Sequence, residues 1–280
     1  MAALVDCHCH TKISPDGLNT MEEMARASYA AGVRYQCFTD HCDPVDWMNG
    51  GFFPRCREIP ALVRAARDEL LPALPADMTL CAGMELGESH FYPDVAREIV
   101  AGAKVDFILG SYHISPQYGD YYGIHYTSPQ QCEELFDLYL DGLQTLAEWD
   151  IFDVMAHIGY FRRYAWAQGV DAALTAERFE KKLTRLFRTL IQNGRGIEIN
   201  CSGIRDGCGP LPGEDVLRLY RSLGGRLVTI GSDAHCTRDA AKGLRRGLEI
   251  LREVGFEQVA FYVRREPRLL PIGELLNDNL

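Results

Sequence analysis

Short runs of β-branched and apolar residues alternate with longer amphipathic segments along almost the whole chain. The seven runs with strand character are Ala3–Cys9, Val33–Thr39, Met78–Met84, Val105–Gly110, Phe152–Ala156, Gly196–Asn200 and Arg226–Gly231. The seven segments with helical periodicity are Met21–Ala31, Glu58–Leu71, Pro93–Ala103, Pro129–Trp149, Thr175–Gln192, Glu214–Leu223 and Ala240–Val254. Because strands that alternate with helices pair side by side in parallel, this order predicts an α/β fold.

The first predicted helix opens without the Gly-x-Gly-x-x-Gly fingerprint of open dinucleotide-binding sheets. A closed or nearly closed barrel is therefore the favoured architecture. No Pro/Ser-rich linker interrupts the alternation, so we expect a single domain over residues 1–280. After the seventh helix, Gln258–Val263 predicts one more strand, which a basic, proline-containing tail follows.

The composition is that of an ordinary soluble globular protein, with 47% hydrophobic and 24% charged residues. The formal net charge is −10. This disfavours binding of duplex nucleic acid, which needs a basic surface to neutralise phosphates. A small phosphorylated metabolite remains compatible with it, because bound metal ions would dominate the local field.

No stretch approaches the ~20 apolar residues of a membrane-spanning helix, and no cationic leader precedes the first strand. The ten cysteines form no Cys-x-x-Cys pair. We therefore expect a cytoplasmic protein with reduced, mostly buried thiols and no membrane partner. Cys42 and Cys236 each follow a histidine of interest, and a small buried side chain is the favoured interpretation of both over a ligand role.

Two histidines stand one residue apart in the stretch DCHCHTKISPDG, residues 6–17. Side chains alternate between the two faces of a strand, so His8 and His10 share one face. Two neighbouring imidazoles can hold a metal ion between them. Taken alone, the pair fits a metal site and a solvated strand end equally well.

The remaining strands place further polar residues at the same position, their carboxyl ends. In a parallel barrel these ends surround one mouth. The residues there are His8, His10, Asp16, His41, Glu85, His113, His157, Asn200, Arg205, Asp233 and His235. Six of the eight histidines in the chain are among them. This convergence predicts a metal site with nitrogen and oxygen ligands, which suits zinc, manganese or iron. Nine candidate ligands exceed the needs of one ion, so we expect two or three divalent ions that share a bridging carboxylate.

These motifs, in this order, resemble those of the PHP (polymerase and histidinol phosphatase) family of metal-dependent phosphoesterases. The matching elements are His-x-His, Thr-Asp-His, a lone Glu after the third strand, an isolated His after the fourth and fifth, and Asp-x-His after the seventh. The resemblance covers essentially the whole chain. It implies a distorted seven-stranded (β/α)7 TIM-like barrel that holds a trinuclear metal centre.

The resemblance also implies which side chains hold each ion. The first ion would take His8, His10, Glu85 and Asp233. The second would share Glu85 and add His113 and His157. The third would take Asp16, His41 and His235. Some family members have a histidine where this chain has Asp16.

Two further stretches resemble the histidinol-phosphate phosphatase branch of the family, namely HIGYFRRY (157–164) and EINCSGIRDGCGPLP (198–212). The match implies that Arg162 and Arg205 bind the phosphate of L-histidinol phosphate, in the pathway of histidine synthesis. Without the resemblance, both could be surface arginines at the entries to helices. Cys201 stands where a threonine is commoner in this branch.

Other residues receive weaker assignments. Asp233, His235 and a metal-bound water are candidates for the general acid. Asp6 and Asp40 are candidates for partners of the metal-bound imidazoles, and each could equally cap a strand end. His90 is expected to be structural. His125 lies in the tyrosine-rich stretch Ser115–Gln131, which resembles an active-site loop, and is a candidate for substrate contact. Carboxylates and tyrosines at the mouth suit a small cationic, aromatic substrate end: Glu88, Asp120, Tyr118, Tyr121, Tyr122 and Tyr126.

Two alternative functions stay open at this point. One is a PHP-type phosphoesterase for another ester, such as a nucleotide, a short oligonucleotide or a phosphotyrosyl protein. The other is a non-catalytic metal-binding domain, which is disfavoured because every expected ligand is present. The sequence predicts no oligomeric state.

Overall fold

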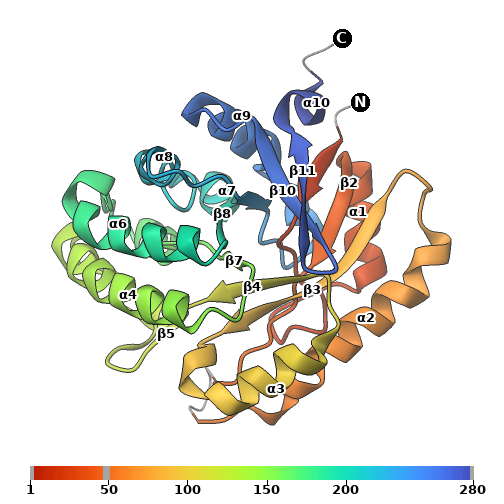
Figure 1. Cartoon of the computed structure of the whole chain (residues 1–280), viewed down its shortest axis with the longest axis horizontal. Coiled ribbons are helices and arrows are strands. Elements are labelled where there is room, and N and C mark those ends of the chain that lie inside the picture. Colours follow the sequence, from red (N-terminus) through yellow and green to blue (C-terminus); the bar gives the residue numbers. More distant parts are fainter. Residues whose placement is uncertain (1–2, 47–50, 278–280) are drawn as a thin grey trace.

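A parallel sheet of seven strands forms the centre of the computed structural model, which describes residues 3–46 and 51–277 (Figure 1). The strand order is β1-β2-β3-β4-β7-β8-β9, and each strand is hydrogen-bonded to the next in parallel. The strands are β1 (Leu4–Asp6), β2 (Val33–Phe38), β3 (Thr79–Gly87), β4 (Phe107–Ser111), β7 (Val154–Met155), β8 (Gly196–Asn200) and β9 (Val228–Gly231).

The two end strands of this sheet meet, so the sheet closes into a barrel. The backbone N–H of Cys7 donates to the carbonyl of Ile230 over 2.8 Å. Beyond the strand ends, Cys9 and Ala234 form a parallel bridge. The predicted seven-stranded β/α barrel is therefore confirmed.

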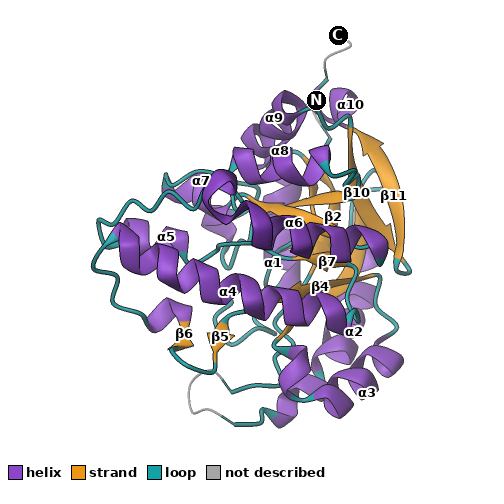
Figure 2. Ribbon diagram, turned by 60° about the vertical axis from the view of Figure 1, so that its left-hand side comes forward, coloured by secondary structure: helices purple, strands orange, loops and turns teal. Residues whose placement is uncertain are grey.

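Helices that follow the strands cover the outside of the barrel (Figure 2). They are α1 (Met21–Ala30), α2 (Ile59–Leu70), α3 (Pro93–Ala103), α4 (Pro129–Trp149), α6 (Ala176–Gln192), α8 (Glu214–Ser222) and α9 (Leu244–Val254). Local signals set several of their starts. Thr20 and Glu23 form a capping box at α1, and the Ser128 hydroxyl accepts from the N–H of Gln131 at α4. Among the described residues, no helix combines the length and the apolar character needed to cross a membrane.

Several short elements were not predicted. They are β5 (Ile114–Ser115), β6 (Gly119–Asp120), α5 (Arg162–Ala167), α7 (Ser202–Asp206), β11 (Glu266–Pro271), α10 (Ile272–Leu276) and the 3-10 turns 54–57, 71–73, 89–91, 121–123 and 237–239. Such short pieces lack the length over which residue periodicity becomes visible.

The C-terminal segment corrects one prediction. The predicted strand β10 (Gln258–Val263) forms, but it pairs antiparallel with β11, where we expected only a tail. The turn between them places Arg264 and Arg265 in the left-handed region, with φ of 55° and 66°. The carboxylate of Asp106 accepts from the N–H of Arg264, and Asp153 pairs with the guanidinium of Arg265. Asp106 directly precedes β4, and Asp153 directly precedes β7. The β10–β11 hairpin therefore lies at the amino ends of the barrel strands, opposite the mouth.

Candidate metal centre

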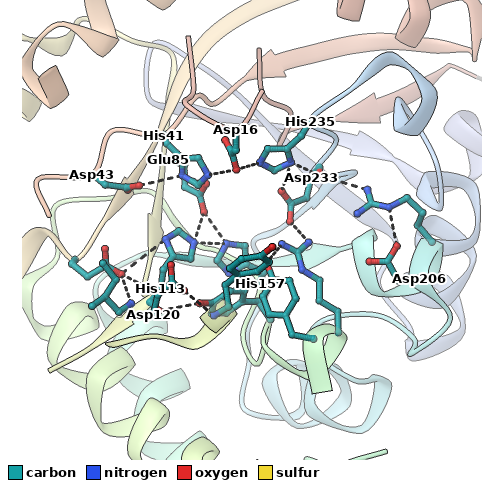
Figure 3. Close-up of a pocket in the computed structure, with 17 residues that line it drawn as sticks. Asp16, His41, Asp43, Glu85, His113, Asp120, His157, Asp206, Asp233 and His235 are labelled. Atoms are coloured by element: carbon teal, nitrogen blue, oxygen red, sulfur yellow. Dashed lines mark hydrogen bonds and ion pairs between the residues drawn. The ribbon is translucent and has the colours of Figure 1, made fainter. Parts of the chain in front are cut away.

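Seven of the nine predicted ligands line a cavity of about 540 Å³ at the carboxyl ends of the strands (Figure 3), and the other two, His8 and His10, are fully buried beside them. This volume lies within the ~300–1,000 Å³ range of small-molecule sites. The residues that line it are Asp16, His41, Asp43, Glu85, Glu88, His113, Ile114, Asp120, Tyr122, His157, Tyr160, Arg163, Tyr164, Arg205, Asp206, Asp233 and His235.

Glu85 occupies the middle of this arrangement. Its Oε1 lies 2.7 Å from His157 Nε2 and 3.2 Å from His113 Nε2. Its Oε2 lies 3.1 Å from His41 Nδ1 and 3.3 Å from His8 Nε2. Burial alone would raise the pKa of this carboxyl, but the charges of His8 and His41 hold the pKa well below its usual value. Glu85 is thus an ionised carboxylate whose two oxygens face different imidazoles.

Four groups drawn entirely from the predicted ligands each bring three ligand atoms within 4.8 Å of one another. They are His8–His10–Asp233, His8–Glu85–His157, His41–Glu85–His113 and His10–His41–His235. Asp16, the ninth predicted ligand, has its Oδ2 3.0 Å from His235 Nε2 and 3.6 Å from His41 Nε2. The structure therefore brings all nine predicted side chains together.

The polar atoms of this group suit divalent metal ions. The Nε2 atoms of His8 and His10 are 3.0 Å apart, and those of His113 and His157 are 3.2 Å apart. Glu85 Oε2 is buried and makes no hydrogen bond within the described residues. Burial and the charges of His235 and His41 lower the pKa of His10 to about 3, so its imidazole is neutral and offers a lone pair. A cation between such facing atoms would satisfy them together.

Glu198 supports the centre from behind and was missed by sequence reasoning. Its Oε1 lies 2.8 Å from His8 Nδ1, and its Oε2 accepts from the N–H of His157 over 2.8 Å. The carboxylate therefore directs the Nε2 of His8 toward Glu85 and His10. A Cβ on Gly231 would lie 2.4 Å from Glu198 Oε1 and 2.3 Å from His8 Cβ, so only glycine fits there. The one feature that could have drawn attention to Glu198 is that it is a charged residue inside a fully buried strand, β8.

Asp6 and Asp40 do not touch imidazoles, contrary to expectation. Asp6 accepts from the N–H of His8 and from the N–H and hydroxyl of Ser232. Asp40 accepts from the hydroxyl of Ser14 over 2.8 Å, and this hydroxyl lies 3.1 Å from His10 Nδ1. Both carboxylates therefore accept hydrogen bonds from backbone N–H groups and serine hydroxyls. Asp40 is linked to the imidazole of His10 only through Ser14.

Arg205 reaches the cavity as predicted, whereas the prediction for Arg162 is corrected. Arg162 does not line this cavity; its Nε donates to the carbonyl of Ala172, and it lines a separate cavity of about 390 Å³. Its neighbour Arg163 lines the metal-centre cavity and donates from Nη1 to Asp233 Oδ2 over 2.8 Å. The two arginines lie in α5, where successive residues point about 100° apart, so one of them faces away.

A family model described as the PHP domain matches residues 6–202. The chain belongs to the PHP family. The predicted family is therefore confirmed.

Relatives of this PHP chain cover nearly all of its length. A probable histidinol-phosphatase of Thermotoga maritima is 26% identical over 92% of the chain and 95% of the relative. A histidinol-phosphatase of Lactococcus lactis is 21% identical over 92% of the chain and 94% of the relative. The crystal structure of the Lactococcus lactis histidinol phosphate phosphatase, complexed with zinc, L-histidinol and phosphate, has a TM-score of 0.77. It is 18% identical and matches 95% of this chain and 98% of the solved one. This likeness shows the fold.

The tyrosine-rich loop of the PHP barrel differs from our expectation. Tyr121 and Tyr126 are buried in the core, where both stack on Phe161. Tyr122 does line the cavity. Tyr118 and His125 are exposed and do not line it, so the prediction of substrate contact by His125 is not supported by its position. The aromatic rings fold inward because burying them removes a large apolar area from water.

The three remaining side chains of interest have structural positions. Cys42 is buried with its Sγ 3.2 Å from the carbonyl of Cys56, and Cys236 Sγ lies 3.2 Å from Asp239. Neither thiol belongs to any of the potential metal groups of the described residues. His90 stacks on Tyr112, and burial lowers its pKa to about 4.

Two further carboxylates, those of Asp43 and Glu88, lie beside His113. Asp43 Oδ1 accepts from the N–H of Gly87 over 3.0 Å. Glu88 Oε1 accepts from the N–H groups of His113 and Ile114. Burial raises the pKa of Glu88 to about 7, and the nearby charge of Asp43 adds to the rise. Asp43 was missed by sequence reasoning because nothing in its spacing distinguishes it from an ordinary loop aspartate.

Proposed function

We propose that this PHP protein is a metal-dependent phosphomonoesterase that hydrolyses L-histidinol phosphate to L-histidinol and phosphate, a step of histidine synthesis. The observation that carries this proposal is the convergence of nine nitrogen and oxygen side chains, seven of which line one cavity together with two arginines. The histidinol-phosphatase relatives, which match 92% of the chain, support the choice of substrate.

Three divalent ions would be held by the nine side chains. His8, His10, Glu85 and Asp233 would hold one ion, Glu85, His113 and His157 a second, and Asp16, His41 and His235 a third. The donor set suits zinc, manganese or iron. When bound, such ions neutralise phosphoryl oxygens as Lewis acids and lower the pKa of coordinated water.

Arg163 and Arg205 would bind the phosphate. A guanidinium group is planar and donates two parallel hydrogen bonds to a phosphate, which lysine cannot match. Arg205 is held for this task by Asp206, whose Oδ1 accepts from its Nε over 3.1 Å. Arg163 is held by Asp233 and by the hydroxyl of Tyr164, which accepts from its Nη2 over 2.8 Å.

The proton for the leaving alkoxide would come from the Asp233–His235 side of the cavity. His235 Nδ1 lies 3.6 Å from Asp233 Oδ1, and both side chains line the cavity. A general acid has to lie within hydrogen-bond reach of the ester oxygen, directly or through one water.

A panel of phosphate esters tests the assignment. We expect kcat/KM for L-histidinol phosphate to exceed that for p-nitrophenyl phosphate and for nucleoside monophosphates by at least ~100-fold, or ~2.7 kcal/mol of barrier. Equal or better hydrolysis of a nucleotide would refute the proposed substrate and leave the metal chemistry in place.

A further inference from the structure

The cavity presents guanidinium groups on one side and the carboxylates of Asp43, Glu88 and Asp120 on the other. Asp43 Oδ2 lies 3.3 Å from His41 Nδ1. Arg205 is bonded to Asp206 and Arg163 to Asp233. In Figure 3, Asp206 lies to the right of the cavity, whereas Asp43 lies to the left beyond His41. A ligand that spans the cavity therefore meets cationic groups at one end and anionic groups at the other.

Asp43 and Glu88 form the buried part of the anionic side. One oxygen of each, together with a ring nitrogen of His113, lies within 4.8 Å of the others. Asp43 is 6% exposed and Glu88 is fully buried, yet both line the cavity. Glu88 Oε1 is occupied by backbone N–H groups, but its Oε2 is buried without a hydrogen-bond partner in the described residues. A buried acceptor left unpaired is costly, and a ligand donor would remove that cost.

The geometry favours a cationic N–H donor over a further metal ion. His113 Nε2 faces Glu85 and His157, at 3.2 Å from each. If Nε2 takes part in the metal centre, Nδ1 carries the ring proton and cannot be a ligand. Two carboxylate oxygens then remain, fewer than the four ligands of a typical transition-metal site. Charge-assisted N–H···O bonds measure ~2.7–2.9 Å, so one ammonium nitrogen fits between two oxygens separated by less than 4.8 Å.

The β5–β6 hairpin brings a third carboxylate to this side. Glu88 holds the N–H of Ile114, and Ile114 pairs directly with Asp120 on the neighbouring strand. Asp120 lines the cavity and uses its Oδ1 to accept from the N–H of Tyr122. Glu88 therefore holds β5, and β5 pairs with the strand β6 that carries Asp120.

We propose that Asp43, Glu88 and Asp120 form a subsite for the ammonium group at the end of the substrate remote from the phosphate. This inference rests on the proposed function, because L-histidinol phosphate carries a primary amine in addition to its phosphate. The metal centre and arginines accept any phosphate ester, so the anionic subsite is what selects for the amine.

Two pairs of measurements test the subsite. The first compares 2-aminoethyl phosphate with ethyl phosphate, which differ in the amine alone. The second compares L-histidinol phosphate with p-nitrophenyl phosphate. We expect Glu88→Gln, Asp43→Asn and Asp120→Asn each to lower the kcat/KM ratio of the amine-bearing ester to its partner at least ~10-fold. The amide oxygens preserve the backbone hydrogen bonds, and metal content is measured for every variant.

Asp206→Asn is the matched control, because it makes the same chemical change in the same cavity at the phosphate end. It should change kcat/KM for both esters of a pair by the same factor and leave the ratio of the two kcat/KM values unchanged. Unchanged ratios in all three subsite variants would overturn the proposal. So would the loss of one metal equivalent with an equal fall for both esters, which would make the group a metal site. If the unmodified protein prefers 2-aminoethyl phosphate but not L-histidinol phosphate, the subsite stands and the proposed substrate fails.

Discussion

Arg163 and Asp233 form a partly buried ion pair in which guanidinium Nη1 and carboxylate Oδ2 are 2.8 Å apart, while the other carboxylate oxygen faces the imidazoles. That oxygen, Oδ1, lies 3.5 Å from His10 Nε2 and 3.8 Å from His8 Nε2. One carboxylate therefore joins the arginine side of the cavity to the metal centre. A substitution of the arginine should therefore also weaken metal binding, and a substitution of a metal ligand should also affect the arginine.

The adjacent arginines provide a test of this link. Arg163→Ala should lower kcat/KM by ~30- to 1,000-fold, because a charge-assisted phosphate contact is worth ~2–4 kcal/mol of barrier. It should also weaken metal retention, since Asp233 loses its partner. Arg162→Ala removes the same side chain one position earlier and should stay within ~3-fold of the unmodified enzyme. Steady-state kinetics and elemental analysis of both variants test this expectation. A larger fall in kcat/KM for Arg162→Ala than for Arg163→Ala would show that Arg162, and not Arg163, binds the phosphate.

Glu85→Gln should be the most damaging change among the proposed ligands. The carboxylate contacts imidazoles through both oxygens, and an amide supplies neither the charge nor two equivalent acceptors. We expect at least one ion to be lost and kcat/KM to fall by more than ~100-fold. Glu134→Gln, an exposed position on α4, is the control for the chemical change. Full activity with full metal content in Glu85→Gln would show that the bridge is misplaced.

Glu198→Gln tests the support behind His8. The partners of metal-binding histidines typically contribute 10- to 100-fold in metal affinity. We therefore expect metal affinity, measured by competition with a chelator, to weaken by a factor in this range. The fold should persist, because the amide oxygen can still accept from the N–H of His157. Identical chelator curves for both proteins would remove Glu198 from the site.

His90 makes stability depend on pH. Its pKa is about 4 in the folded protein, against the usual value of about 6.5 for an unfolded chain. Between these values the unfolded chain binds the proton and the folded one does not, so stability falls as the pH drops from 6.5 toward 4. Allowing for partial exposure, this costs about 1–2 kcal/mol near pH 4.5.

His90→Phe removes the effect, because the ring packing on Phe91 and Tyr112 remains and the buried Nδ1 has no hydrogen bond to lose among the described residues. Urea unfolding at pH 7 and pH 4.5 measures it. The variant should lose less stability than the unmodified protein over this interval. Equal losses would show that His90 titrates normally.

The ends of the strands were the most predictable part of the molecule. A parallel barrel places every strand's carboxyl end at one mouth, so the chain positions of His8, Glu85 and Asp233 are enough to bring them together. Long amphipathic helices were equally clear, and α3 (Pro93–Ala103) and α4 (Pro129–Trp149) have the predicted bounds.

What escaped prediction depends on side-chain direction in short elements. The choice between Arg162 and Arg163 requires the rotation of a six-residue helix, which periodicity cannot resolve. Tyr121 and Tyr122 are neighbours in one 3-10 turn, yet one is buried and the other is exposed. Glu198 stood out only as a charged residue within the strand β8, and nothing local to it indicates a contact with His8, 190 positions away.

Closure of the barrel between its first and last strands has a consequence for the order of events during protein synthesis. Cys9 and Ala234, which meet at that seam, are 225 positions apart. A ribosome adding ~5–20 residues per second needs roughly 10 to 45 s to cover that distance. During this time His8 and His10 have been synthesised while Asp233 and His235 do not yet exist. Loading of the proposed metal centre would therefore be a late event, because a nascent chain that stops short of residue 233 carries an incomplete set of the proposed ligands.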